Sequence, residues 1–85
     1  MKEQYFDKME IRNKRTFKYR GYTFVSYDDF FMGEWMGNVN VLDKDERNVM
    51  HATLAEPNMS QEELEDYAKS YFSFRDLLLP RFQKG

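Results

Sequence analysis

The chain has 85 residues, no cysteine, 18% aromatic residues and a net charge of −2, which predicts one small domain over residues 1–85. This composition excludes a disulfide framework, a thiolate nucleophile and cysteine-based metal sites. No apolar run approaches the roughly 20 residues of a membrane-spanning helix, and the first residues lack the apolar core of a secretory signal. We therefore expect a soluble, cytoplasmic protein that has no membrane partner.

Residues 1–12 form a segment of uncertain structure. Tyr5, Phe6 and Met9 have the spacing of one face of a short helix, whereas Met9 and Ile11 alternate with charged residues as in a strand. We expect a turn or a short N-terminal helix here, leading into an extended segment.

Residues 16–27 carry the clearest hairpin signal. A two-residue turn at Arg20-Gly21 brings four aromatic side chains onto one face, because Gly21 can supply the positive φ that such a turn requires. In this register, the opposed pairs are Tyr19 with Tyr22 and Phe17 with Phe24. Cross-strand aromatic pairs each contribute about 0.2–1 kcal/mol, which favours this register.

Residues 35–54 predict a second hairpin, whose turn is the polar run 43–48. In this hairpin, Val41 is expected opposite Met50, and Val39 opposite Ala52. Trp35 and Leu54 fall on the same apolar face, and the other face is mostly polar. This alternation is typical of an antiparallel sheet that is covered on one side, so Trp35 is predicted to lie in the core.

Residues 60–78 predict a helix. Ser60 is an N-cap and Glu63 completes a capping box, while Pro80 is expected to stop the helix and leave residues 80–85 as a tail. The predicted apolar stripe consists of Leu64, Tyr67, Ala68, Tyr71 and Leu78, with Phe72 and Phe74 flanking it. The acidic residues at the helix start could mimic phosphates, but a favourable interaction with the helix dipole is the simpler interpretation.

Together these elements predict an α+β fold. Two hairpins would form an antiparallel sheet of three to four strands, and the C-terminal helix would pack on one face of it.

The sequence contains no residue pattern of a catalytic or metal site. The single histidine, His51, is predicted on the polar face of the second hairpin, with no nucleophile beside it. The run 43–48 resembles a calcium loop only superficially, because Arg47 stands where a ligand oxygen is needed. We therefore expect no enzyme activity, no cofactor and no metal ion.

The first 20 residues carry a charge of about +4, and residues 12–20 interleave cations with aromatic residues. Cations together with stacking aromatic rings are typical of surfaces that bind single-stranded nucleic acid. The candidate contacts for this alternative function are Lys14, Arg15, Lys18 and Arg20. The predicted register weakens the alternative, since it places the aromatic rings and Lys18 on opposite faces.

Residues 27–37 are predicted to connect the two hairpins, either as a plug of the core or as an exposed interface. Large apolar side chains dominate this stretch, and a short connection cannot point all of them inward. Phenylalanine and methionine are enriched at the centres of protein interfaces. The predicted partner-binding residues are Asp28, Asp29, Phe30, Phe31, Met32 and Met36.

These patterns favour a small, non-enzymatic protein-binding module that inhibits or regulates a larger partner. Small, cysteine-free acidic domains of this kind are often encoded by phages or plasmids, so a host nucleic-acid enzyme or a defence complex is a plausible target. A second copy of the chain is an alternative partner. Nucleic-acid binding through the basic hairpin is the second hypothesis.

Overall fold

In the computed structural model, the described backbone covers residues 10–84 and the described side chains cover residues 10–73. The short N-terminal helix predicted within residues 1–12 lies almost entirely outside this range, and residues 11–12 begin the first strand.

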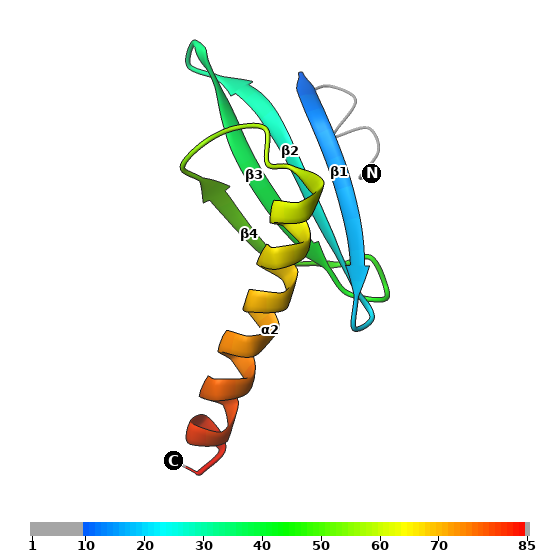
Figure 1. Ribbon diagram of the computed structural model, residues 1–85, viewed down its shortest axis with the longest axis vertical. Coiled ribbons are helices and arrows are strands. Elements are labelled where there is room, and N and C mark those ends of the chain that lie inside the picture. Colours follow the sequence, from blue (N-terminus) through cyan, green and yellow to red (C-terminus); the bar gives the residue numbers. More distant parts are fainter. Residues whose placement is uncertain (1–9, 85) are drawn as a thin grey trace.

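The described chain forms a four-stranded antiparallel sheet followed by one long helix (Figure 1). The strands pair in the order of the sequence, β1-β2-β3-β4. The elements are β1 (Ile11–Tyr19), β2 (Tyr22–Phe31), β3 (Glu34–Leu42), β4 (Asn48–Leu54) and α2 (Gln61–Lys84). This arrangement confirms the predicted α+β fold.

The two predicted hairpins have the expected registers. Tyr19 pairs with Tyr22 and Phe17 with Phe24 between β1 and β2. Between β3 and β4, the pairs are Val41 with Met50, Val39 with Ala52 and Asn40 with His51. Arg20 and Gly21 both have positive φ, 54° and 81°, which is the backbone of a type I′ turn. The alternation of apolar and polar residues was therefore sufficient to define both registers.

Residues 27–37, by contrast, do not form a loose connection. They continue β2 and begin β3, so that a third hairpin joins the other two. Phe30 pairs with Trp35 and Phe31 with Glu34 across a two-residue turn. The turn residues Met32 and Gly33 have φ values of 52° and 86°. The stretch joins the two predicted hairpins as expected, but it does so as paired strands, which were not predicted. Methionine is an unfavourable residue at positive φ, so this turn has no familiar sequence signal.

The helix begins with the predicted capping box. The backbone N–H of Glu63 donates to Ser60 Oγ at 3.1 Å, and the backbone N–H of Ser60 donates to Glu63 Oε1 at 2.8 Å. These reciprocal bonds satisfy two N–H groups that have no partner within the helix.

The far end of α2 differs from the prediction. The helix continues through Pro80 to Lys84, where an end near Leu78 and a tail over residues 80–85 were expected. Proline costs a helix interior about 3 kcal/mol, but leucine, arginine, glutamine and lysine around it are good helix formers.

The core lies between α2 and one face of the sheet. Its buried residues are Phe24, Val39, Val41, Leu64, Ala68 and Phe72. Phe72 is central, not flanking as predicted, because its ring contacts Tyr19, Tyr22 and Phe24 at centroid distances of 5.7, 5.4 and 6.0 Å. Aromatic contacts thus supply much of the packing of this small domain.

Residues 55–60, which we call the crossover loop, pass over the sheet from the end of β4 to the start of α2 beside β1 (Figure 1). The loop lies close against Gly37, where an added Cβ would collide with the Glu56 carbonyl oxygen. Its backbone also bonds to Asp28 of β2. The loop therefore divides the helix-bearing face into a core region and an outer region at the β2–β3 turn.

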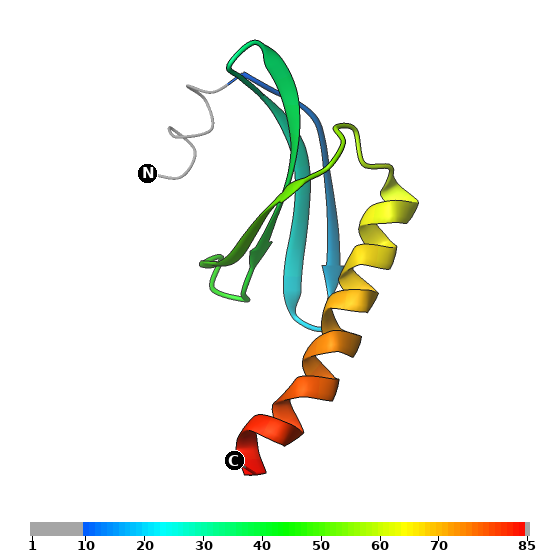
Figure 2. The ribbon, with the colours of Figure 1, turned by 90° about the vertical axis from the view of Figure 1, so that its left-hand side faces the viewer.

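The two faces of the sheet differ. Figure 2 shows α2 on one side only, and the helix packs mainly against β1 and β2. We call this the helix face and the opposite one the open face. The turn between β2 and β3 lies at the end of the sheet away from α2 (Figures 1 and 2).

Candidate functional site

The β2–β3 turn carries the most exposed apolar surface of the described chain. We define the hairpin tip as Phe30, Phe31 and Met32, whose exposed fractions are 47%, 61% and 85%. Among the described residues, Val49 is the other large apolar side chain that is exposed. Alternation along β2 places Phe30 on the helix face and Phe31 on the open face. The hairpin tip therefore exposes apolar side chains on both faces of the sheet.

Trp35 supports the base of the hairpin tip. Its ring meets Phe30 edge to face at a centroid distance of 5.3 Å, and the Arg12 guanidinium lies 3.8 Å from its centroid. Trp35 is only half-buried and does not belong to the core cluster. The prediction that it lies in the core was wrong, although its face was right, because the crossover loop separates Trp35 from the core.

Asp28 is not available to a partner, contrary to the prediction, because it is 1% exposed. Its carboxylate accepts the Asn58 backbone N–H at 2.8 and 3.0 Å and Asn13 Nδ2 at 2.8 Å. Asn13 and Asn58 both have positive φ, 57° and 62°. Asp28 therefore holds the β1 bulge and the crossover loop together.

Asp29 and Met36 face each other on the open face and are partly buried. Asn38 links this pair to the neighbouring strand: its Nδ2 donates to Asp29 Oδ1 and to the Met36 carbonyl, both at 3.1 Å. Asn38 Oδ1 lies 3.0 Å from His51 Nε2. Asp29 and Met36, both predicted as partner residues, therefore lie beside a row of polar side chains and are less accessible than the hairpin tip.

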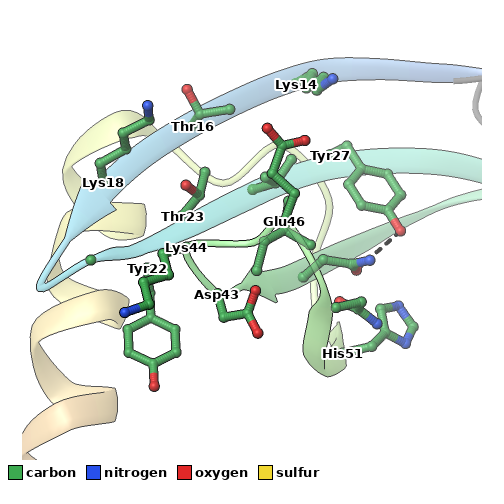
Figure 3. A pocket seen from close by; sticks show the side chains of 15 residues that line it. Lys14, Thr16, Lys18, Tyr22, Thr23, Tyr27, Asp43, Lys44, Glu46 and His51 are labelled. Atoms are coloured by element: carbon green, nitrogen blue, oxygen red, sulfur yellow. Dashed lines mark hydrogen bonds between the residues drawn. The ribbon is translucent and has the colours of Figure 1, made fainter. Parts of the chain in front are cut away.

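The open face is hollowed into a cavity of about 1090 Å³ beside this polar row (Figure 3). Val25 and Tyr27 are buried and belong to its lining, and the Tyr27 hydroxyl donates to Asn40 Oδ1 at 3.2 Å. Charged side chains of both signs line it: Lys14, Lys18, Asp43, Lys44 and Glu46. The mixed charges give this hollow no preference for one sign of ligand.

The four predicted nucleic-acid contacts do not form one surface. Lys14 and Lys18 line the hollow of the open face. Arg15 instead donates to the Met59 carbonyl at 2.7 Å and to Asn58 Oδ1 at 3.2 Å, so it holds the crossover loop. Arg20 lies over the rings of Tyr19 and Phe72. The aromatic residues of β1 pack against the core, as the register predicted.

The turn that resembles a calcium loop is closed by its own hydrogen bonds. Asp43 Oδ1 accepts the backbone N–H groups of Asp45 and Arg47, both at 2.9 Å. Among the described residues, no group of three or more histidine or acidic side chains could hold a metal ion. Within the same part of the chain, no helix has the length and apolarity to cross a membrane.

Sequence reasoning missed the contacts of the crossover loop. From the sequence, Asn13 and Asn58 received no role and Arg15 was assigned to nucleic-acid binding. In the structure, all three join the loop to β1 and β2. The available signal was asparagine itself, which adopts the left-handed conformation more readily than most residues. Gly37 within a strand was a second signal, because such a glycine often marks the close approach of another backbone.

Comparison of the chain with protein-family models, curated proteins and solved structures finds no match. The candidate sites therefore depend on the chemistry of this chain alone.

Proposed function

We propose that this chain is a cytoplasmic, non-enzymatic protein-binding module that inserts its hairpin tip into an apolar groove of a larger protein. In that role it would act as an inhibitor or regulator by occupying its partner's surface. A phage- or plasmid-encoded origin, with a host nucleic-acid enzyme or defence complex as the target, fits this proposal.

The observation that carries the proposal is the exposure of Phe30, Phe31 and Met32 at one turn. Exposed large apolar side chains are common singly, but their concentration at one projecting site is typical of interaction surfaces. Phenylalanine offers a large apolar area, and methionine adapts to an irregular groove.

The preorganisation of the tip further supports the proposal. A two-residue turn joins paired strands here, and the Arg12–Trp35–Phe30 stack supports one face of the hairpin. A side chain that is already held in place loses less conformational entropy on binding. The tip therefore resembles a preformed anchor more than a loop that must be ordered by its partner.

The test is affinity capture from a lysate of the organism that encodes the chain. The variant Phe31→Ser/Met32→Ser removes tip surface and leaves the Phe30–Trp35 contact in place. The matched control is Val49→Ser, which removes an exposed apolar side chain on β4. We expect the wild type and the control to retain a partner that the tip variant loses by at least about tenfold, on the scale of an interface hot spot. Equal recovery by all three proteins would refute the proposal.

Salt dependence separates this proposal from nucleic-acid binding. Contacts to phosphates weaken steeply as salt rises, whereas an apolar anchor is expected to hold its partner at moderate salt. Nucleic-acid binding would be favoured if the chain recovers nucleic acid at low salt but not at high salt, and if the tip variant recovers as much of it as the wild type. Nucleic-acid binding has less support than the hairpin-tip proposal, because only two of its four predicted cations, Lys14 and Lys18, share a surface.

A further inference from the structure

The two edges of the sheet are protected to different degrees. At the β1 edge, Lys14 and Lys18 are exposed, a bulge interrupts the pairing near Asn13, and Gln61 Nε2 donates to the Thr16 carbonyl at 3.1 Å. Charged side chains and bulges are the usual protection of an edge strand against pairing with another chain. At the other edge, β4 has the sequence NVMHATL, with no lysine, arginine, acidic residue or proline.

The unpaired backbone groups of β4 follow from the register. A two-residue hairpin turn is flanked by a hydrogen-bonded pair, here Phe31 with Glu34, and such pairs then alternate along the strands. The alternation turns the N–H and C=O groups of Val39 and Val41 towards β4, where they meet Ala52 and Met50. The backbone groups of His51 and Thr53 therefore point outwards.

No hydrogen bond to these outward backbone groups exists within the described part of the chain. A bulge near Val49 interrupts β4 at its start, but residues 50–54 are paired regularly with β3. In Figure 2, the side of the sheet that carries β4 faces the viewer, and α2 lies to the right of the sheet. Residues 50–54 thus present an open and regular edge without lysine, arginine or acidic side chains.

We propose that this edge pairs with the same edge of a second copy of the chain, in an antiparallel register centred on Ala52. His51 of each copy then lies opposite Thr53 of the other and exchanges two backbone hydrogen bonds with it. Met50 lies opposite Leu54 of the other copy, and the two Ala52 residues meet at the symmetry axis.

The side chains suit a symmetric pair. Ala52 is small, as the closely spaced, non-hydrogen-bonded pair at the axis requires. Met50, Ala52 and Leu54 are partly buried on the helix face, so the seam would extend the apolar surface that adjoins the core. His51 and Thr53 are exposed on the open face, and each His51 lies opposite a threonine of the other copy and not opposite a second histidine. An isologous contact requires such self-complementarity.

The symmetry of this pairing determines where the two helices lie. The symmetry axis of two antiparallel edges runs perpendicular to the sheet, so both copies place α2 on the same face. Because α2 packs mainly against β1 and β2, the packed part of each helix lies away from the seam, while the C-terminal half of α2 runs past the sheet on the side of β4 (Figure 1). A contact of a few residues per strand is small, so the dimer is expected to dissociate at low concentration.

The test uses the full chain and a pair of variants that differ at one residue. His51→Lys/Thr53→Lys places lysines opposite each other across the seam, whereas His51→Lys/Thr53→Glu places opposite charges there. Sedimentation equilibrium from about 10 µM to about 1 mM would measure the mass, in a range suited to weak association. The wild-type mass should rise from 10.4 kDa towards twice that value. The Lys/Lys variant should dissociate at least about tenfold more readily than the Lys/Glu variant, as an added like-charge penalty of about 1.4 kcal/mol implies.

Urea unfolding of both variants would show that each monomer is folded. A wild type that stays monomeric up to the highest concentration would overturn the proposal, as would equal association of the two variants. Loss of the dimer in Phe31→Ser/Met32→Ser, with the Lys/Lys variant unaffected, would assign self-association to the hairpin tip instead. The dimer proposal is thus independent of partner capture by the tip, because the two are tested by different variants.

Discussion

Asp28 shows how one buried carboxylate can connect three parts of a small fold. It lies on β2, accepts bonds from Asn13 of β1 and from Asn58 of the crossover loop, and has almost no contact with solvent. A buried acceptor with several donors stabilises the fold only as long as every donor keeps its partner. A sequence shows that an aspartate is present but not that two distant donors converge on it, which is why Asp28 was assigned to a binding surface.

Asp28→Asn is expected to lower the free energy of unfolding by about 1–3 kcal/mol. The introduced amide has one acceptor oxygen and no negative charge, so the Asn58 N–H and Asn13 Nδ2 can no longer both bond to a carboxylate oxygen. Asp29→Asn is the matched control, because Asp29 is less buried and accepts one bond from Asn38, a side chain that can reorient. Urea unfolding would measure both, and equal losses would contradict the role assigned to Asp28.

Tyr67 gives the fold a dependence on alkaline pH. Burial, and to a lesser degree the neighbouring Tyr71, raise the pKa of Tyr67 above its usual value of 10.0. The folded state therefore favours the neutral phenol, whose contribution is complete below the unfolded pKa and is lost as pH rises through the folded pKa. Stability should consequently fall above about pH 10.

Tyr67→Phe removes this titration, so its stability should fall less between about pH 8 and about pH 10.5 than that of the wild type. Urea midpoints at the two pH values measure the difference between the proteins. Tyrosines that do not interact with Tyr67 contribute equally to both proteins and cancel in the comparison. Parallel decreases would show that Tyr67 does not contribute to the pH dependence.

At the level of elements, the sequence predicted what depends on local alternation. The aromatic pairs of the first hairpin, the apolar pairs of the second and the Ser60–Glu63 capping box are all as expected. The tip hairpin was missed because Met32 is a poor residue for positive φ. Alternation also assigned Trp35 to the correct face, but it cannot show how far along that face the helix extends.

Gly37 tests whether the crossover loop lies where the structure places it. A Cβ at this position would collide with the Glu56 carbonyl oxygen, whereas a Cβ on Gly33 of the tip turn meets no atom within 4 Å. Gly37→Ala should destabilise the fold by about 1–3 kcal/mol through overpacking. Gly33→Ala is the comparison, because an alanine at a φ of 86° adds backbone strain but no collision with another atom.

Thermal or urea unfolding would compare the two glycine variants. The Gly37 variant should also weaken the loop contacts, which tryptophan fluorescence can follow because Trp35 lies just beyond the loop. A fully stable Gly37→Ala protein would mean that the loop does not approach β3 closely.

For the whole molecule, the position of α2 determines which surfaces remain available. The helix and crossover loop cover the inner part of one face and leave the hairpin tip, the open face and the β4 edge uncovered. In the proposed dimer, the antiparallel seam would direct the two tips towards opposite ends of a continuous sheet. The assembly would then offer two identical anchors, and a partner with two grooves would gain from binding both.

The hydrogen bonds at the helix start also make the chain-entropy cost of folding depend on the order in which the elements form. Each strand pairs with its neighbour across a short turn, but the bonds from Gln61 to Thr16 and from Arg15 to Met59 join residues 45 and 44 positions apart. Closing a loop of that length costs about 3 kcal/mol, from the logarithmic dependence on loop length. The three hairpins need only local closures. Once they have formed, β1 and β4 belong to one sheet and only the crossover loop remains to be closed, so the helix start can dock on β1 without most of that cost.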